Sequence, residues 1–499
     1  MWAKLRKYKR WILPGVLLLQ AILLFSRLDL LSLWGDEIFT LETVVKPFGR
    51  MIEALRGDVH PPLYYLLVHG FIELPLPWDL PERIRAFSAL CVLAATVMLD
   101  VFWLRRIKTY KRMLVLALWT VSPAVILYGR MGRSYAMQAA VVVLAVHLMW
   151  RLRLMPSWGA MAAAAAGTLL TLYTHYLPGI AIASACTALL LVEAARDGKW
   201  RAFRLWMGSL VIVGAGYAPW ILTLGGSVVK WGEASAISAR YVVSPDPWLN
   251  QLAKAGYTFV ALTFGECLPL WAAPLCVLVI PLLIVMLARL PRRGDAFTWL
   301  LLLSAAVGYV GAARWVSYPF IAARLLWVLP FFWLWMATNT DVARWRRWAL
   351  YLLLFADDAS LLSYYRVDHF LNKGYASPLR EMAASVHGGM VIADTYNTDF
   401  RAFAWYVGKT AEVRFADAPS AARIREEARA QQTVWVLRNM HDISPGKLMT
   451  QLEAAVCEGR RIARHQYLPY TAWEKEAMRV MRIAEPPSHF IELTECSRP

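Results

Sequence analysis

Long apolar segments alternate with short polar stretches along most of this chain. Most of the segments run for about 20 residues, the length that an α-helix needs to cross the hydrocarbon core of a bilayer. The pattern predicts about eleven membrane-spanning helices, at residues 11–31, 82–104, 113–129, 134–152, 158–175, 177–195, 204–224, 268–289, 297–314, 321–340 and 346–364. Residues 1–365 are therefore expected to form a polytopic α-helical membrane domain.

From residue 366 to residue 499 the hydropathy falls and the period changes. Short apolar runs such as MVIAD and TVWVLR alternate with helical stretches such as SAARIREEARAQQ. This alternation predicts a small C-terminal α/β domain. The domain lacks a glycine-rich phosphate loop, so we assign it no nucleotide. It contains Cys457 and Cys496, which can form a disulfide where the domain is extracytoplasmic.

The basic residues cluster in the short loops, at residues 4–10, 105–112, 196–204, 289–293 and 344–347. With the N-terminus in the cytoplasm, every cluster lies inside, as the positive-inside rule requires. An odd number of spans then places the C-terminal domain outside. Segment 62–77 is short for a span, and counting it would invert the later loops, so we expect a juxtamembrane or re-entrant helix there. The predicted location is the plasma or inner membrane, with segment 11–31 as an uncleaved signal anchor.

Composition agrees with this class. The chain has 499 residues, of which 59% are hydrophobic, too many for a soluble protein of this length. Its net charge of +18 lies in loops that flank apolar segments, which argues against a nucleic-acid partner and for the lipid bilayer. The six cysteines show no CxxC or other ligand spacing, so a zinc or iron–sulfur site has little support.

The first outer loop, residues 32–81, carries the most informative polar residues. It opens with Asp36-Glu37 and contains His60 before two prolines. A carboxylate at the membrane surface suits a general base, although an acidic pair also stabilises the N-terminus of a helix. The same pair could bind Mg²⁺ or Mn²⁺, so metal dependence stays open. His60 is either a contact for a phosphate or acceptor, or a loop histidine bonded to backbone.

The order of these motifs, an anchor, Asp36-Glu37, His60-Pro61-Pro62-Leu-Tyr-Tyr and RIRAFSAL, resembles the GT-C glycosyltransferases of the protein O-mannosyltransferase and aminoarabinose-transferase superfamily (glycosyltransferase family 39 and relatives). The likeness covers roughly the first 140 residues by motif and the rest by architecture. It implies a polyprenyl-phosphate-linked sugar donor and inverting transfer on the outer face. It also implies Asp36 as the catalytic carboxylate, with Glu37 beside it to orient the acceptor or an arginine. The acceptor would be a protein, a lipid or an envelope glycan.

A phosphate leaving group needs cations, and arginine binds phosphate through paired hydrogen bonds. The resemblance places Arg133 and Tyr135 at the lipid phosphate. Further candidates for donor binding at the outer face are Arg130, His175 and Arg324. Arginines and tyrosines also gather at membrane edges without a catalytic role. We favour the binding role for Arg133 and the interfacial role for Arg130.

Two rival functions remain open from the sequence. A lipid-linked sugar transporter or flippase would carry ionisable residues near the bilayer midplane and repeated halves. Only Asp357-Asp358 meets the first condition, and a span that ends near Phe355 would place both at the interface. The other rival is a non-catalytic scaffold whose C-terminal domain binds a partner.

Overall fold

The structure is a computed structural model that describes residues 10–58, 60–227, 247–269, 278–281, 283–285, 295–315, 321–338, 344–367, 370–442, 444–480 and 490–499. The chain divides into two compact units. The first comprises Met1–Leu28, Thr40–Val242 and Asp246–His369, and the described part of the second comprises Asp29–Phe39 and Phe370–Pro499.

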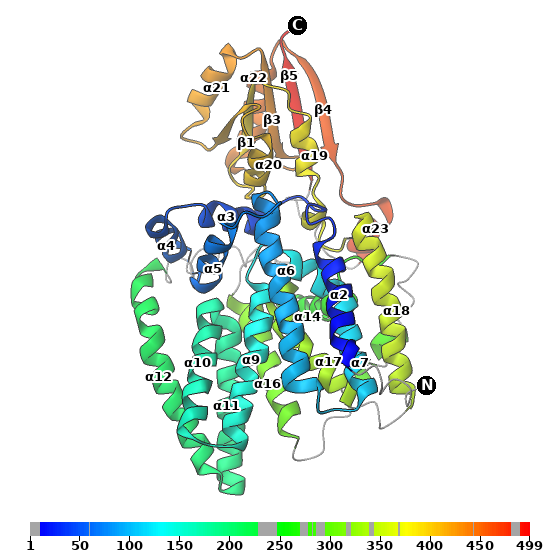
Figure 1. Cartoon of the computed structure of the whole chain (residues 1–499). Coiled ribbons are helices and arrows are strands. Elements are labelled where there is room, and N and C mark those ends of the chain that lie inside the picture. The colour runs from blue at the N-terminus through cyan, green and yellow to red at the C-terminus, as the bar shows by residue number, and fades with distance from the viewer. Residues whose placement is uncertain are drawn as a thin grey trace. The chain divides into compact units, whose positions relative to one another are not determined.

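The first unit is a bundle of helices (Figure 1). In chain order these are α2 (Ile12–Phe25), α4 (Phe48–Gly57), α5 (Leu63–Ile72), α6 (Leu80–Leu99) with the π-helix η2 (Asp100–Leu104), α7 (Thr109–Val121), α8 (Pro123–Arg130), α9 (Tyr135–Leu154), α10 (Trp158–Thr174), α11 (Tyr176–Asp197), α12 (Trp200–Leu224), α14 (Pro247–Thr263), α16 (Ala296–Trp315), the 3₁₀-helix η4 (Ala322–Val328), α17 (Leu329–Thr338) and α18 (Arg344–Arg366). Helix α3 (Gly35–Val44) begins in the second unit and ends in the first.

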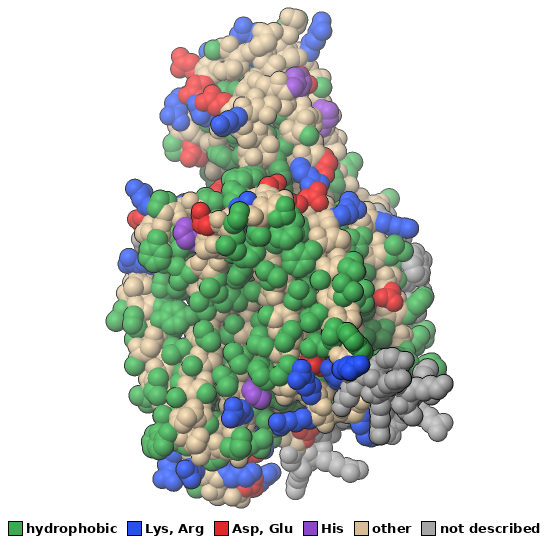
Figure 2. Space-filling model, in the orientation of Figure 1, with side chains coloured by type: hydrophobic (Ala, Val, Ile, Leu, Met, Phe, Trp, Pro, Cys, Tyr) green, Lys and Arg blue, Asp and Glu red, His purple; other side chains and the backbone are tan. Residues whose placement is uncertain are grey.

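Several of these helices can cross a bilayer. Within the described residues, five are long and apolar enough, and a bent pair formed by α7 and α8 makes a sixth. Figure 2 shows hydrophobic side chains over much of the visible face of this unit. These features are those of a multi-pass membrane protein. The larger number of spans stays a prediction, and most of the segment 268–289 lies outside the described residues.

Two predicted spans differ in detail from the helices. Segment 113–129 is two helices that meet at a 50° bend, because Pro123 cannot donate to the preceding turn. The Ser122 hydroxyl instead accepts from the Val125 amide at 3.4 Å and starts α8. The first apolar segment ends its helix at Phe25, and Arg27 has a positive φ of 52°. Leu28 beyond it is buried in protein.

Some arginines near helix ends form ion pairs with buried carboxylates. Arg112 Nε lies 2.5 Å from Asp100 Oδ1, which ties η2 to α7. Arg153 Nη2 lies 2.6 Å from Glu193 Oε1, which ties α9 to α11. Many other Lys and Arg side chains gather at the lower end of this unit in Figure 2. Removing one partner of such a buried pair leaves an uncompensated charge, so these four residues have a structural role.

The second unit contains a mixed five-stranded sheet with strand order β2-β1-β3-β5-β4. Strand β1 is parallel to β2 and β3, whereas β5 is antiparallel to β3 and β4. After α3, its elements are η6 (Lys373–Ala376), α19 (Leu379–Ala384), β1 (Met390–Asp394), α20 (Phe400–Val407), β2 (Glu412–Ala416), α21 (Ala421–Ala430), β3 (Thr433–Asn439), η7 (Pro445–Lys447), α22 (Leu448–Cys457), β4 (Arg461–Tyr467), α23 (Ala472–Val480) and β5 (Ile491–Ser497).

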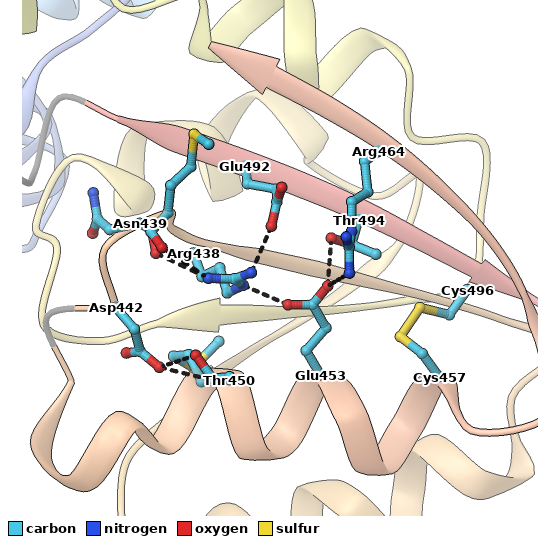
Figure 3. A network of polar contacts seen from close by, with 12 residues as sticks. Arg438, Asn439, Asp442, Thr450, Glu453, Cys457, Arg464, Glu492, Thr494 and Cys496 are labelled. Carbon is cyan, nitrogen blue, oxygen red and sulfur yellow. Dashed lines mark hydrogen bonds and ion pairs between the residues drawn. A yellow bond between two sulfur atoms is a disulfide. The ribbon is translucent and has the colours of Figure 1, made fainter. Parts of the chain in front are cut away.

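Helices α21 and α22 cover one face of this sheet, where Ile424 and Met449 pack with Ile392 and Val436. A polar network crosses the same layer (Figure 3). The Arg438 guanidinium lies 2.5 Å from Glu453 Oε2 and 2.6 Å from Glu492 Oε1. This arginine therefore joins α22 to β3 and β5, and the expected α/β fold of this region is confirmed.

A disulfide joins Cys457, at the end of α22, to Cys496 on β5. Closing a loop of 39 residues removes conformational entropy from the unfolded chain, worth about 4 kcal/mol in the chain-entropy model. We expect replacement of both cysteines by alanine to lower the melting temperature of the C-terminal unit, measured by calorimetry. A reductant should lower the wild-type value and leave the double variant unchanged. Equal melting of oxidised and reduced wild type would contradict this expectation.

Candidate active site

The acidic pair lies in the first turn of α3. This helix begins where the Trp34 carbonyl accepts from the amides of Glu37 at 2.9 Å and Ile38 at 3.0 Å. Glu37 is buried, whereas Asp36 is half-buried. Negative charge is favourable at this end of a helix, and that role does not prevent Asp36 from reacting. Of the two carboxylates, Asp36 is the more accessible to a substrate.

Arg133 lies in the short segment between α8 and α9 and is buried. Its Nη1 donates to Tyr65 Oη at 2.9 Å and to Thr40 Oγ1 at 3.3 Å. Its Nη2 donates to His60 Nε2 at 3.0 Å. None of these three acceptors carries a negative charge. These contacts orient the guanidinium.

His60 is fixed on its other side by Asp58. His60 Nδ1 lies 2.7 Å from Asp58 Oδ2 and 3.0 Å from the Asp58 carbonyl. Because Nε2 accepts from Arg133, the neutral ring carries its proton on Nδ1. Helix α5 begins directly after Pro61 and Pro62, so the loop that presents this histidine is restricted. Asp58 is not among the predicted site residues, and its spacing of two residues from His60 is the signal for it in the sequence.

His175 lies between α10 and α11. Its Nδ1 accepts from the Leu177 amide at 3.1 Å, so the neutral ring carries its proton on Nε2. Burial, and then the neighbouring His60, Arg324 and Arg133, hold the pKa of His175 well below its usual range. His175 is therefore neutral near pH 7 and keeps an N–H donor. Four predicted site residues therefore lie in one region of the first unit: His60, Arg133, His175 and Arg324.

The depressed pKa of His175 makes stability depend on pH. In the unfolded chain this imidazole takes up a proton near pH 6.5, whereas the folded protein resists protonation to lower pH. We expect the melting temperature in detergent to fall as pH is lowered from about 7.5 to about 5.5, and to fall less in His175→Asn. Asparagine supplies an acceptor for Leu177 without titrating. The exposed His387→Gln serves as control, and equal pH dependence in all three proteins would refute the assignment.

Arg324 lies in η4, half-buried. Its Nη1 has no hydrogen-bond partner among the described residues. A buried, unpaired guanidinium nitrogen costs free energy unless an anion binds it.

Tyr135 is buried in the first turn of α9, two residues after Arg133.

Arg130 makes different contacts from the other candidates. Its Nη2 donates to the Ser26 carbonyl at 2.9 Å and also to the Arg27 carbonyl. Its guanidinium stands 5.5 Å from the ring centre of Tyr364 and 5.7 Å from that of Tyr365. These contacts tie the end of α8 to α2 and α18, which favours a structural role for Arg130.

Besides Asp100 and Glu193, the carboxylates of Glu266 and Asp357 are buried in the first unit. Glu266 accepts from the hydroxyl of Tyr128 on α8. Asp357 is fully buried within α18, which continues to Arg366 rather than ending near Phe355. The apolar surroundings of Glu266 in the sequence were the signal for it.

No group of three or more His, Cys, Asp or Glu side chains that could hold a metal ion occurs among the described residues. Asp36 and Glu37 offer two carboxylates, whereas Mg²⁺ takes six oxygen ligands.

No family model and no curated protein sequence matches the chain. Solved structures do. ArnT from Cupriavidus metallidurans bound to undecaprenyl phosphate matches with a TM-score of 0.52 and 13% identity, over 98% of both chains. A second match is the archaeal oligosaccharyltransferase AglB from Archaeoglobus fulgidus, in complex with an inhibitory peptide and a dolichol-phosphate. It has a TM-score of 0.51 and 12% identity, over 94% of this chain and 74% of the AglB chain. The structure of the oligosaccharyltransferase from Archaeoglobus fulgidus in complex with Zn and sulfate has a TM-score of 0.50 and 13% identity, over 85% of this chain and 67% of that chain.

ArnT and AglB are both glycosyltransferases of the GT-C fold. The chain therefore has the GT-C fold along nearly its whole length, and the fold that the sequence resemblance implied is confirmed.

Proposed function

We propose that this protein is a membrane glycosyltransferase that moves a sugar from a polyprenyl-phosphate donor to an acceptor on the outer face of the membrane. The observation that carries the proposal is the buried, charged Arg133 in one region with His60, His175 and Arg324. Arg133 and Arg324 supply cations and His175 an N–H donor, a combination that suits a phosphate. The undecaprenyl phosphate in ArnT and the dolichol-phosphate in AglB support a lipid phosphate as the anion.

Helix α3 connects this region to the proposed base. Thr40 on α3 accepts from Arg133. Asp36 precedes Thr40 by four residues on the same helix, and residues at that spacing lie on one helical face. Along α3, the proposed base therefore lies one turn before the residue that accepts from Arg133.

In the proposed reaction, an acceptor hydroxyl or amine attacks the anomeric carbon while Asp36 takes its proton. The bond between that carbon and the phosphate oxygen breaks, and polyprenyl phosphate leaves with the electron pair. Attack opposite the leaving group inverts the anomeric configuration. The phosphate leaves without a protein acid because its second pKa is about 6, and Arg133 and Arg324 stabilise the charge that it gains. Glu37 orients the acceptor or an arginine.

We further propose a cytoplasmic N-terminus, a membrane domain at residues 1–365 and an extracytoplasmic domain at residues 366–499. The Cys457–Cys496 disulfide supports an oxidising compartment for the second domain. The sugar, hexose or pentose, and the acceptor, whether protein, lipid or envelope glycan, are set by the pocket. A divalent cation at Asp36 and Glu37 is tested by activity with and without a chelator.

The test is sugar transfer in membranes from radiolabelled polyprenyl-phosphate donors, each carrying one sugar. We expect the wild type to consume one donor and to release polyprenyl phosphate in equal amount to the sugar transferred. Movement of intact donor between leaflets of proteoliposomes, without any release of polyprenyl phosphate, would favour the transporter instead. Transfer that survives deletion of residues 366–499 would count against the scaffold.

A further inference from the structure

The segment that carries Asp36 is fastened by the C-terminal part of the chain. Residues Asp29–Phe39 belong to the same compact unit as Phe370–Pro499. The Arg380 amide donates to Ser32 Oγ at 3.3 Å, and the Leu33 amide donates to Tyr406 Oη at 2.8 Å. These bonds link positions more than 340 residues apart in sequence. The approach of the chain to α3 is therefore set by the α/β unit.

The start of α3 needs a cap from outside its own sequence. The first backbone N–H groups of a helix have no partner within it, and a Ser, Thr, Asp or Asn before the helix commonly supplies one. Trp34 precedes α3 and has no side-chain acceptor. The Gly35 amide donates instead to Asp399 Oδ1 at 2.6 Å. Asp399 precedes α20 but makes no side-chain cap there, so its carboxylate is directed to α3.

The contact is also too close for a larger residue at Gly35. A Cβ added there would lie 2.8 Å from Asp399 Oδ1 and 2.9 Å from Thr398 Oγ1. Both distances are shorter than van der Waals contact, so a side chain at this position would displace the Asp399 carboxylate and the Thr398 hydroxyl. Glycine at this position allows the loop of the α/β unit to reach the residue directly before Asp36.

We propose that Asp399 is a positioning residue for the reaction: by capping α3 at Gly35, it fixes the first helical turn and with it the Asp36 carboxylate. This inference rests on the proposed function, in which Asp36 is the base. It gives the C-terminal unit a direct part in the proposed chemistry of Asp36.

The protonation state of Asp399 makes the strength of this cap depend on pH. Burial raises the pKa of Asp399, the bond from Gly35 opposes the rise and the nearby Asp36 carboxylate adds to it, and together they bring this pKa to about 6. A charged carboxylate is a stronger acceptor for an N–H than a neutral one. The cap therefore weakens as the pH falls through about 6.

The test compares Asp399→Ala, Asp399→Asn and a matched control, Asp417→Ala. Asp417 belongs to the same unit, and its Oδ1 accepts from the Ser420 amide at 2.9 Å just before α21. We expect Asp399→Ala to lower kcat about 10- to 100-fold with little change in KM for the donor, because a displaced catalytic group loses alignment. Asp417→Ala should keep wild-type kcat. Asp399→Asn keeps an acceptor for Gly35, so its kcat at neutral pH should lie between that of Asp399→Ala and that of the wild type. Its pH–rate profile should lack the fall in rate near pH 6 that titration of Asp399 causes in the wild type.

Amide hydrogen exchange separates this inference from the proposed function. Asp399→Ala should speed exchange in the peptide around Gly35, and Asp417→Ala should not. Unchanged kcat and exchange in Asp399→Ala, with Asp36→Asn inactive, would refute the positioning role and leave the proposed function standing. An active Asp36→Asn would refute the proposed base itself. If Asp399→Ala does not fold, an unaltered pH profile in Asp399→Asn overturns the inference.

Discussion

Asp36→Asn is expected to reduce kcat for sugar transfer at least about a hundredfold, as for a removed general base. The amide has nearly the shape of the carboxylate but cannot take up the acceptor proton. Donor binding should not weaken, because the substitution removes a negative charge from the neighbourhood of the lipid phosphate. The measurement is single-turnover transfer from a radiolabelled donor, with donor affinity measured separately on the same membranes.

Two further variants make this result specific. Glu53→Gln removes an exposed carboxylate from α4 in the same outer loop and should leave kcat unchanged. Glu37→Gln removes the buried neighbour of Asp36 and should cost less than Asp36→Asn. Full activity in Asp36→Asn together with loss in Glu37→Gln would move the base to Glu37. Wild-type activity in both Asp36→Asn and Glu37→Gln would show that neither carboxylate takes part in the reaction.

Hydropathy located some of the helices closely. The expected segment 158–175 corresponds to Trp158–Thr174, and the expected segment 134–152 corresponds to Tyr135–Leu154. Hydropathy extended the first predicted span too far, because the apolar residues beyond the end of α2, such as Leu28, are buried in protein. Hydrophobicity reports that a side chain avoids water and does not distinguish lipid from a protein core.

The contacts of the site were largely beyond the reach of the sequence. Arg133 and His60 were identified as candidates from residue type and resemblance, but their bond joins positions 73 residues apart. The bond between Gly35 and Asp399 joins positions 364 residues apart. The first could be suspected because both residues lie at predicted outer loops. The second could not, because nothing local marks Asp399 as a cap for another helix.

Replacing Arg133 is expected to have the second large effect. Negative charge on the phosphate grows as the sugar leaves, so a buried guanidinium stabilises the transition state more than the bound donor. We expect Arg133→Gln to lower kcat/KM by about a hundred- to a thousandfold, as for other electrostatic groups aimed at developing charge. Arg133→Lys should recover part of this loss, because lysine keeps the charge without the paired hydrogen bonds.

The alternative for Arg133 is a purely structural role, since it also organises His60, Tyr65 and Thr40. Donor affinity and melting temperature, measured on the same purified variants, distinguish the two. Arg56→Gln is the matched control, because Arg56 is exposed and donates to the Thr223 carbonyl at 2.7 Å. Loss of donor affinity at wild-type melting temperature supports the phosphate site. A lower melting temperature with unchanged kcat/KM in the folded fraction would make Arg133 a structural residue, and the phosphate would then need Arg324 as its principal cation.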